Sequence, residues 1–518
     1  MCSLRCAERL YPIRILSHGA RGYTSAQPSR SPTTDDMKRH FEALEINRIF
    51  ILEKITKYDI ERKNGLNDHE IRTRFPLAYK THMTHVGIMD YLLRQLNERF
   101  KIHTIVVKAQ SHNLSIIDTE LSAFPPDLII SAGGDGTFLE AASLVPPKGP
   151  YAKPLWIVGI NTDPERSMGA LCLSYFNEHN AFFKRPHPAL EKGGNDTCIS
   201  SKQKMIRFNI KTDAPREECT SDSIGEKEWS DISGASFGGI NQLADSSAPD
   251  HCTVISKNDS NVYSLTYDEY IGNLLDRLLT KRECKPICRQ KIRIKVFKRH
   301  NPAASNEETL TKDSANIEEI LFDGTESNFN PDELTTKNMV KGKIRAPYGA
   351  VNDVIVADRS FGKTFYALVQ VDNSPIMRVK SSGVLVTTGT GSTAWAYNMC
   401  KESLSHGMQL FKKLLYHPDF PQDAVSKVTP KMMQEAIESH NEDLVFGASS
   451  KNLKCIIREG IQDLSTVEHS SFTGRQVKLL SLSKNAELFI DGSKTIKVDY
   501  GDVVVLKTFD SDVIWSCV

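Results

Sequence analysis

The chain of 518 residues is long enough for two or three domains, each with a sizeable core. Its 65 lysines and arginines nearly balance its 64 aspartates and glutamates, so the net charge of +1 favours neither nucleic acid nor another polyanion as a partner. No apolar run is long enough to span a bilayer, which predicts a soluble protein without a membrane partner. The 11 cysteines are scattered, as is typical of a reducing compartment, and none has the spacing of a metal site, so no protein-bound metal is predicted.

The N-terminal segment, residues 1–34, differs from the rest of the chain. It is rich in arginine and serine and contains one acidic residue, Glu8, whereas acidic residues become common from Asp35 onward. This composition is typical of a mitochondrial transit peptide and predicts delivery to the mitochondrial matrix. Cleavage is predicted after Tyr23, because Arg21 would then be the third residue before the cut. The alternative is a disordered basic tail without a targeting role.

Residues 46–175 combine short apolar runs with one amphipathic segment. The apolar runs predict buried strands, and the segment 84–100 has apolar residues at helical spacing. Strands that alternate with helices predict a parallel sheet in a three-layer α/β domain. The strands are expected over residues 48–52, 104–107, 128–130 and 155–160.

The segment between the third strand and the next helix is Gly133-Gly134-Asp135-Gly136-Thr137. Glycines at a strand-to-helix turn expose backbone N–H groups, and together with the helix N-terminus they form a site for phosphate. A carboxylate repels anions, so Asp135 is out of place in a turn that only binds phosphate. It fits a turn in which it takes a proton from a hydroxyl, or holds a metal ion, beside the phosphate. An Asp-Gly turn without a function explains a single such dipeptide better than it explains this five-residue segment.

A second polar residue, Asn161, directly follows the strand predicted over residues 155–160. Ligands of parallel sheets bind beyond the carboxyl ends of the strands. The glycine turn follows the strand 128–130 in the same way, so we expect Asn161 and the turn at one edge of the sheet.

The centre of the chain is polar. Residues 186–262 are dominated by Gly, Ser, Asn, Asp and Lys, which predicts a long insertion that is partly disordered. Residues 300–340 are expected to be a loop. Between these two segments, residues 270–279 have the spacing of a helix and residues 292–296 alternate like a half-buried strand.

Residues 265–510 are expected to form a second, β-rich domain. Its strands are short and are separated by turn residues, which suits a sandwich of sheets. A polar helical segment, 401–440, interrupts them. The predicted strands cover residues 351–356, 365–371, 376–379, 384–386, 453–458, 477–482, 486–490 and 503–506.

Two adjacent polar residues, Asn352 and Asp353, lie within one of these apolar strands. Burying them is costly unless they find partners. Either they cap a structural turn, or they bind a ligand, with Asn352 bonded to a base and Asp353 accepting hydrogen bonds from sugar hydroxyls. The pair alone does not distinguish these two roles.

The segment 387–395, Thr-Thr-Gly-Thr-Gly-Ser-Thr-Ala-Trp, follows a predicted strand and begins a helix. Residues 389–394 match the G-x-G-x-x-A pattern of dinucleotide-binding Rossmann domains, which would indicate a dehydrogenase. The acidic residue expected about 20 residues later is missing, because Glu402 comes too early and Asp419 too late. The hydroxyl groups suit hydrogen bonds to phosphate or ribose in either case.

Three motifs, taken together and in this order, resemble the NAD kinase family: the 133–137 turn, the Asn352-Asp353 pair and the 387–395 loop. The likeness is strongest to the mitochondrial members of the family. Residues 159–167 and 380–383 also resemble segments of those members. It covers residues 46–175 and 265–510. The glycine turn alone is shared with lipid kinases of the diacylglycerol and sphingosine type, whereas the three motifs together are specific.

The resemblance implies an ATP-dependent phosphotransferase that binds NAD between an α/β domain and a β-rich domain. It implies that Asp135 takes the proton of the 2′-hydroxyl of the adenosine ribose, and that this hydroxyl attacks the γ-phosphate of ATP to give NADP and ADP. A divalent cation, Mg²⁺, accompanies ATP. The family also implies a homodimer.

The remaining site residues follow from the same resemblance. The glycines of the turn approach the phosphates through their backbone, Asn352 and Asp353 contact the adenosine part of NAD, and the loop lines the dinucleotide pocket. The residues predicted to bind NAD or ATP are Gly133, Gly134, Gly136, Thr137, Asn161, Asn352, Asp353, Thr390, Thr393, Ala394 and Trp395, with Asp135 as the catalytic residue.

Two rival functions would use the same residues. A lipid kinase would phosphorylate a lipid hydroxyl and ignore NAD. A catalytically silent dinucleotide-binding protein would bind NAD without forming NADP. The sequence favours the NAD kinase because it contains all three motifs.

Overall fold

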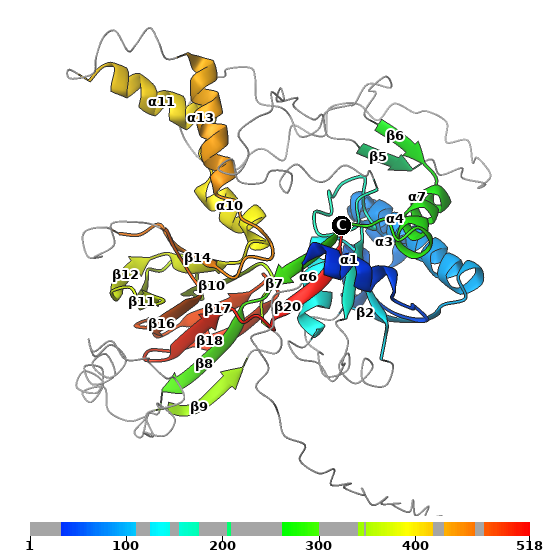
Figure 1. Cartoon of the computed structure of the whole chain (residues 1–518), viewed down its shortest axis with the longest axis horizontal. Helices are drawn as coiled ribbons and strands as arrows, with labels where there is room; N and C mark the ends of the chain where they lie inside the picture. Colours follow the sequence, from blue (N-terminus) through cyan, green and yellow to red (C-terminus); the bar gives the residue numbers. More distant parts are fainter. Residues whose placement is uncertain are drawn as a thin grey trace, which may run out of the picture.

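The computed structural model describes residues 33–109, 125–145, 155–175, 205–208, 262–299, 340–345, 349–417, 429–461 and 471–518. The predicted transit peptide lies almost entirely outside these ranges, as do most of the 186–262 insertion and nearly all of the 300–340 loop. The described chain forms an α/β unit and a β unit, which β7 (Pro286–Gln290) and β20 (Val513–Cys517) join (Figure 1). Within these ranges no helix has both the length and the apolar character needed to cross a membrane.

The first unit is built on a six-stranded sheet in the order β2-β1-β3-β4-β20-β7. Neighbouring strands among β1 (Arg48–Glu53), β2 (His103–Lys108), β3 (Leu128–Ala132) and β4 (Trp156–Ile160) are parallel, as predicted. Every residue of β3 and β4 is buried, as expected for apolar strands of a parallel sheet that is covered on both faces. The predicted α/β fold of this region is therefore confirmed.

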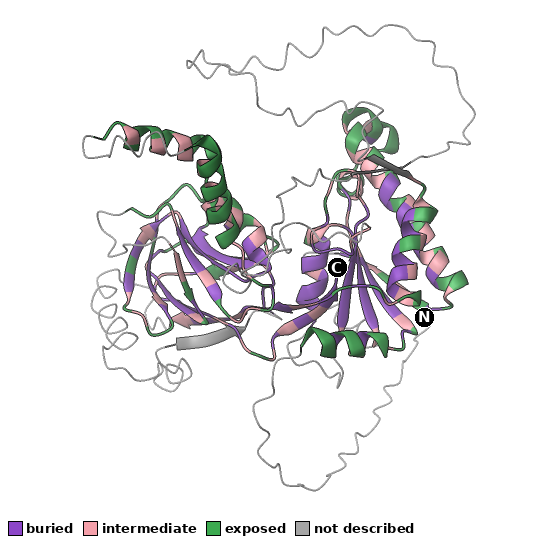
Figure 2. Ribbon diagram, turned by 45° about the horizontal axis from the view of Figure 1, so that its top comes forward, coloured by how far each residue is buried: buried purple, intermediate pink, exposed green. Residues whose placement is uncertain are grey.

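Helices cover both faces of this sheet (Figure 2). On one face α1 (Thr34–Glu42), α4 (Pro76–Arg94) and α7 (Tyr267–Leu275) bury apolar side chains against alternate residues of the strands. On the other face α6 (Asp135–Leu144) packs against the intervening residues. Two short helices pack beside α4, namely α2 (Lys57–Lys63) and α3 (Asp68–Arg74).

Two helices extend beyond the predicted ranges. The helix predicted over residues 84–100 begins at Pro76, because proline suits the first turn of a helix, and it ends in a π-helical segment, η1 (Gln95–Arg99). The helix predicted over residues 270–279 begins at Tyr267, directly after a capping box, and continues as η4 (Asp276–Thr280). Both helices exist as predicted, and only their ends differ.

The second unit contains two antiparallel six-stranded sheets, as expected for a sandwich. One has the order β15-β14-β13-β10-β17-β18 and the other β12-β11-β16-β19-β8-β9. The strands of the first are β10 (Asp353–Asp358), β13 (Gly383–Thr387), β14 (Leu453–Arg458), β15 (Ser471–Gly474), β17 (Ala486–Ile490) and β18 (Lys494–Val498). The strands of the second are β8 (Arg293–Arg299), β9 (Val340–Arg345), β11 (Phe365–Val371), β12 (Met377–Ser381), β16 (Gln476–Ser481) and β19 (Val503–Lys507).

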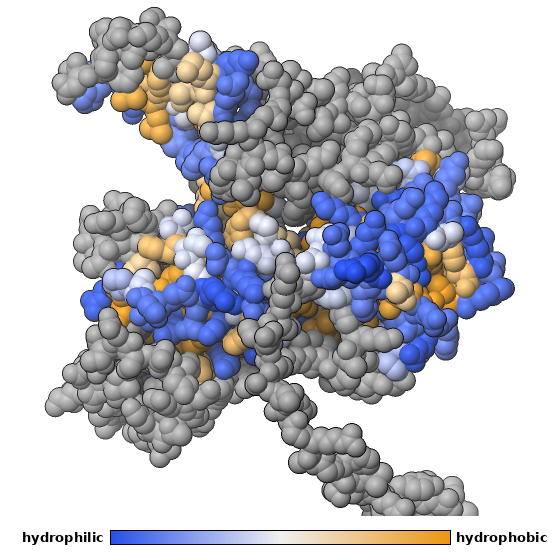
Figure 3. Space-filling view, viewed as in Figure 1, coloured by the Kyte–Doolittle hydropathy of each residue, from blue (hydrophilic) through white to orange (hydrophobic). Residues whose placement is uncertain are grey.

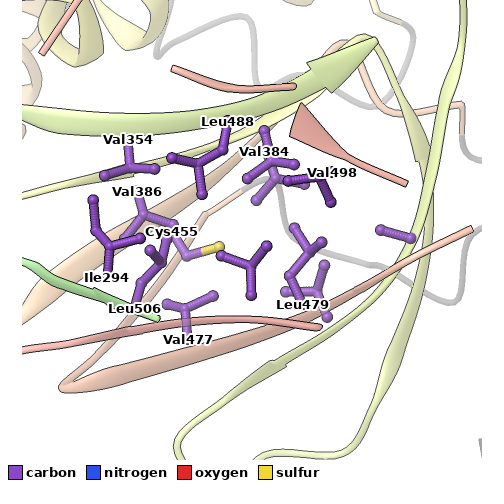
Figure 4. Packing of buried hydrophobic residues seen from close by; sticks show 14 of the residues in the cluster. Ile294, Val354, Val384, Val386, Cys455, Val477, Leu479, Leu488, Val498 and Leu506 are labelled. Atoms are coloured by element: carbon purple, nitrogen blue, oxygen red, sulfur yellow. The ribbon is translucent and has the colours of Figure 1, made fainter. Parts of the chain in front are cut away.

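The two sheets share one apolar core (Figure 4). Val354 and Val386 of the first sheet lie in this core with Val477 and Leu506 of the second. Burial of each such side chain stabilises the fold by about 1.5–3 kcal/mol. The core therefore fixes β10 and β13, which pair directly and carry the Asn352-Asp353 pair and the 387–395 loop at their ends.

The first sheet also contains two strands from the region that the sequence assigned to the β-rich domain. β20 (Val513–Cys517) runs parallel to β4, and β7 (Pro286–Gln290) is antiparallel to β20. The α/β unit thus includes α7, β7 and the C-terminal strand, which differs from the predicted boundary at residue 265. The difference has a physical reason: these pairings join segments far apart in the chain, and no local pattern reveals them.

The rest of the described chain is peripheral to both sheets. In the polar insertion, β5 (Met205–Phe208) pairs in parallel with β6 (Val262–Leu265). The predicted helical segment 401–440 forms α11 (Leu404–Leu415) and α13 (Pro430–Asp443), which project together from the β unit (Figure 1). Neither helix buries a residue, and Figure 3 shows apolar side chains on the surface of this arm.

Candidate active site

The Gly-Gly-Asp-Gly-Thr turn lies between β3 and α6, at the carboxyl edge of the parallel strands. α6 begins at Asp135, with Gly134 as its N-cap. A Cβ atom at Gly133 would lie 2.2 Å from the hydroxyl oxygen of Thr137, so only glycine fits there. Gly136 is exposed and has open space around it. The turn therefore presents bare backbone at the start of a helix, which is the arrangement that binds phosphate.

The half-buried Asp135 side chain contacts the segment that follows β4. Its Oδ1 accepts a hydrogen bond from the N–H of Leu171 at 2.8 Å, and its Oδ2 accepts one from the N–H of Ala170 at 3.2 Å. Each carboxylate oxygen can accept a further hydrogen bond. The two backbone bonds thus orient the carboxylate beside the bare turn and leave it able to accept a proton from a hydroxyl.

Asn161 organises the segment that supplies these two N–H groups. Its Nδ2 donates to the carbonyl oxygen of Ser167 at 2.7 Å, and its Oδ1 accepts from the N–H of Asp163 at 3.0 Å. Gly169, at φ +57°, packs so close that a Cβ there would lie 2.8 Å from the Asn161 Nδ2. Both functional groups of Asn161 are therefore used within this segment, and a contact between Asn161 and a ligand stays a prediction.

In the β unit, Asp491 holds the backbone of the Asn352-Asp353 pair. Its carboxylate accepts hydrogen bonds from the N–H groups of Val351 at 2.9 Å, Asn352 at 2.8 Å and Asp353 at 3.1 Å. Burial of this carboxylate raises the pKa of Asp491, and the three hydrogen bonds oppose the rise. In the sequence Asp491 is recognisable only as part of an Asp-Gly turn signal, so its role was not predicted.

The side chains of the pair are not fully satisfied by the described protein. Asn352 Oδ1 is buried and accepts no hydrogen bond from the described residues. Asp353 is 7% exposed, and burial together with the nearby negative charge of Asp491 raises its pKa to about 7. A buried polar atom without a partner costs about 1–3 kcal/mol. Both groups therefore fit a ligand that offers a donor to Asn352 and hydroxyl groups to Asp353.

The 387–395 loop packs directly against this pair. The Thr388 hydroxyl donates to the carbonyl oxygen of Val351 at 2.5 Å, and the Thr388 N–H donates to that of Asn352 at 2.9 Å. Thr387, at the end of β13, pairs with Asp353 across the ladder. The two motifs of the β unit, far apart in the sequence, thus form one structural element.

The glycines of this loop serve close backbone packing. A Cβ at Gly391 would lie 2.2 Å from the carbonyl oxygen of Asn352, and one at Gly389 would lie 1.9 Å from that of Gly447. The loop follows an antiparallel strand and enters a 3-10 turn, η6 (Gly391–Thr393), before α10 (Trp395–Cys400). This setting differs from the parallel strand and long helix of a Rossmann turn, which removes the structural basis of the dehydrogenase interpretation.

The predicted binding residues of the loop differ in exposure. Thr393 and Ala394 are half-buried and Trp395 is 40% exposed, so all three are accessible to a ligand. Thr390 is buried, and its hydroxyl oxygen lies 3.5 Å from Nη1 of Arg289. Thr390 therefore connects the loop to the first unit.

Two buried cations at the junction of the units were not predicted. Arg289, in β7, is fully buried, and its guanidinium lies 5.5 Å from the ring centre of Phe138 on α6. Lys291 donates from Nζ to the carbonyl oxygens of Ala142 at 3.0 Å and Val145 at 2.9 Å, at the C-terminal end of the same helix. Burial lowers the pKa of Lys291 to about 7. Arg289, Gln290 and Lys291 are three successive polar residues, and such residues normally face solvent, so the sequence gave no signal for the two buried cations.

Curated mitochondrial NAD kinases resemble the chain over most of its length. NAD kinase 2 of Xenopus tropicalis is 23% identical over 482 residues, which cover 90% of this chain and 89% of that protein. NAD kinase 2 of Rattus norvegicus is 20% identical over 477 residues, which cover 88% and 84%. Among solved structures, yeast NADH kinase complexed with NADH matches with a TM-score of 0.41 and 10% identity, covering 91% of this chain and 83% of that one. No protein-family model matches the chain. The resemblance to mitochondrial NAD kinases that the motifs indicated is confirmed by these relatives.

Proposed function

We propose, from this likeness and from the geometry of the site, that the protein is an ATP-dependent NAD kinase that phosphorylates the 2′-hydroxyl of the adenosine ribose of NAD to give NADP. The single observation that carries the proposal is the connection between the two units. Arg289 extends from the sheet that bears the glycine turn to Thr390 in the 387–395 loop. A site suited to phosphate and a site suited to a base and a sugar are thereby held side by side.

Asp135 acts as the general base in the proposed reaction. One carboxylate oxygen takes the proton of the 2′-hydroxyl while the hydroxyl oxygen bonds to the γ-phosphorus of ATP, and the bond from that phosphorus to the oxygen of the leaving ADP breaks. The bare backbone of the turn and the N-terminus of α6 bind the phosphate. The hydrogen bonds from Ala170 and Leu171 keep the base in one orientation during the transfer.

The β unit binds the dinucleotide in this proposal. The free Oδ1 of Asn352 accepts a hydrogen bond from the adenine base, and Asp353 accepts hydrogen bonds from ribose hydroxyls. Thr393, Ala394 and Trp395 line the pocket beside them. Asp491 takes no direct part and holds the backbone from which Asn352 and Asp353 project.

A divalent cation, Mg²⁺, accompanies ATP in the proposed reaction. The described residues contain no group of three or more His, Cys, Asp or Glu side chains that could hold a metal ion. Mg²⁺ commonly takes its ligands from substrate phosphates and water, so it can be bound with ATP while the Asp135 carboxylate acts as the base. When bound, the cation neutralises the charge of the phosphates.

We further infer that the protein works in the mitochondrial matrix, with residues 1–34 as its transit peptide. The arginine-rich, acid-poor composition of this segment and the mitochondrial names of the relatives support the inference. The family resemblance also favours a homodimer. Sedimentation of the purified chain and microscopy of a tagged chain, with and without residues 1–34, test the two expectations separately.

The decisive test of the function is direct. The full chain is incubated with ATP, Mg²⁺ and NAD, and NADP is measured, while parallel reactions contain diacylglycerol or sphingosine with labelled ATP. We expect NADP and no labelled lipid. Labelled lipid without NADP would identify a lipid kinase, and NAD binding in a calorimeter without NADP would identify a silent dinucleotide-binding protein.

A further inference from the structure

Arg289 is a fully buried cation that forms no ion pair among the described residues. Its Nε donates to the hydroxyl of Ser516 at 3.1 Å, and its Nη1 lies 3.5 Å from the hydroxyl of Thr390. Its Nη2 is buried and has no hydrogen-bond partner in the described structure. Burying a guanidinium without an ion pair is costly, so its presence at this position calls for a role beyond packing.

The position of Arg289 relates it to the catalytic turn. Its guanidinium lies over the ring of Phe138, which stands three residues after Asp135 on α6 and therefore on the same face of the helix. Burial lowers the pKa of Arg289 to about 10, and the negative charge of Asp135 opposes this shift. The second titratable group that faces the guanidinium is Cys172, a thiol whose own pKa is raised by burial and which stays uncharged.

We propose that Arg289 is a positioning residue for phosphoryl transfer. Its hydrogen bond to Thr390 fixes the dinucleotide loop relative to α6, and its positive charge acts on the Asp135 carboxylate and on the anionic phosphates beside it. The inference rests on the proposed function, because it assigns Arg289 a part in that reaction. It differs from the roles of the three motifs, since Arg289 belongs to none of them and connects two of them.

Another buried arginine shows what a purely structural role looks like in this unit. Arg277, in η4, is 7% exposed and donates from Nη1 to the backbone carbonyls of Ser174 and Tyr175. Backbone carbonyls are strong acceptors, so Arg277 ties one segment of chain to another. Among the described residues, the Arg289 side chain bonds only hydroxyl groups, which stabilise a cation less, and it lies between the two halves of the site.

Arg289→Met in the full chain tests the proposal through NADP formation from ATP, Mg²⁺ and NAD. Methionine fills buried space without a charge or a donor. We expect kcat to fall by about tenfold or more and the KM for NAD to change by less than about threefold, because the lost interaction acts in the transition state. We expect the thermal midpoint to stay the same or rise, because an unpaired buried cation is removed. A lower midpoint with an unchanged kcat would overturn the proposal.

Arg277→Met is the matched control. It removes a buried arginine from the same unit and leaves two backbone carbonyls without their donor, so we expect a lower thermal midpoint and an unchanged kcat. Arg289→Met should lower kcat without lowering the thermal midpoint, whereas Arg277→Met should lower the midpoint without lowering kcat. This difference distinguishes a positioning role from a packing role. Loss of kcat in both variants to the same degree would contradict a specific role for Arg289.

Arg289→Lys keeps the test decisive if the methionine variant does not fold. Lysine restores the charge but cannot bond Ser516 and Thr390 together, so we expect kcat to lie about threefold to tenfold below that of the wild type. A lysine variant with the wild-type kcat would overturn the role of the Thr390 contact. If the wild type itself forms no NADP, the proposed function fails. If the wild type forms NADP and the Arg289 variants are equally active, only the inference about Arg289 fails.

Discussion

The two halves of the site hold their carboxylates in opposite ways. In the α/β unit, Asp135 is half-buried, and both of its oxygens accept backbone hydrogen bonds. In the β unit, Asp353 is buried near a second carboxylate, Asp491, and its pKa is raised to about 7. Backbone N–H groups thus hold the Asp135 carboxylate in place, whereas burial beside Asp491 disfavours the charged form of Asp353. In the proposed reaction, the first half therefore supplies an oriented base, and the second half gains free energy when a ligand donates hydrogen bonds to Asp353.

Asp135→Asn should have the largest effect. Asparagine keeps the shape and an acceptor oxygen but cannot take the proton, so we expect kcat for NADP formation to fall by about 10³-fold or more. The affinity for NAD, measured by calorimetry, should stay within about threefold of the wild type, because asparagine keeps the size of the side chain and an oxygen that can accept a hydrogen bond from the 2′-hydroxyl.

Glu140→Gln is the matched control for this variant. Glu140 is another half-buried carboxylate on α6, and burial raises its pKa. We expect its kcat to equal that of the wild type. Equal losses of kcat in the two variants would mean that α6 needs negative charge in general. The difference drawn between Asp135 and Asp353 would then have no basis.

Asp491→Ala should have the next largest effect, and on stability. Three backbone N–H groups would lose their acceptor, which costs about 3–5 kcal/mol of unfolding free energy in denaturant titrations. The affinity for NAD should fall as well, because the backbone of Asn352 and Asp353 is no longer held. Asp491→Asn keeps one acceptor oxygen and should lose less; equal stability of the alanine variant and the wild type would refute this role of Asp491.

Asp353→Asn should stabilise the unliganded protein and weaken NAD binding. Because its folded-state pKa of about 7 lies above its ordinary value of 3.8, the folded protein holds an extra proton between these pH values. Stability is therefore lost as the pH rises through this window, and the loss is complete above about pH 7. At pH 8 the variant should gain about 2–4 kcal/mol of unfolding free energy, and below pH 4 the gain should vanish.

Asp358→Asn provides the contrast at the other end of β10. Hydrogen bonds from Ser360 lower the pKa of Asp358, so its ionised form stabilises the fold at neutral pH and this contribution is lost in acid. The Asp358 variant should thus be less stable than the wild type at pH 8, with unchanged NAD affinity. A stabilising effect of Asp358→Asn, or a destabilising effect of Asp353→Asn, would contradict the claim that these two carboxylates affect stability in opposite directions.

Lys494→Met should have the smallest effect. Lys494 donates from Nζ to the hydroxyl of Ser143 and so adds one polar contact between β18 and α6. Such half-exposed contacts contribute about 0–1 kcal/mol, so the thermal midpoint should fall by a few degrees at most and kcat should stay within about twofold. A tenfold loss of kcat would show that the junction of the units depends on Lys494 rather than on Arg289.

The local parts of the site could be predicted from the sequence. The turn at residues 133–137 is specified by adjacent residues, since an apolar run, glycines and a helical pattern follow one another, and the structure places it between β3 and α6 as expected. Most strands of the β unit were predicted as short apolar runs between turn residues, whereas β9, β15 and β18 were not predicted. Asn161 was placed correctly at a strand end, although its amide is used inside its own segment.

The long-range parts could not be predicted. β7 and β20 are short and resemble the other strands, and only pairing with β4 and with each other assigns them to the first sheet. Arg289 and Asp491 act through contacts with residues about a hundred or more positions away, so their neighbours in the sequence carry no sign of their roles. Charge buried at a junction of two units is visible only once both units are folded.

The central claim is that Asp135 faces the 2′-hydroxyl of NAD, and a crystal structure of the Asp135→Asn variant with bound NAD tests it most directly. We expect a side-chain oxygen at position 135 within about 2.6–3.2 Å of that hydroxyl, with the adenosine beside Asn352 and Asp353. A dinucleotide bound elsewhere, with its ribose beyond the reach of position 135, would contradict it.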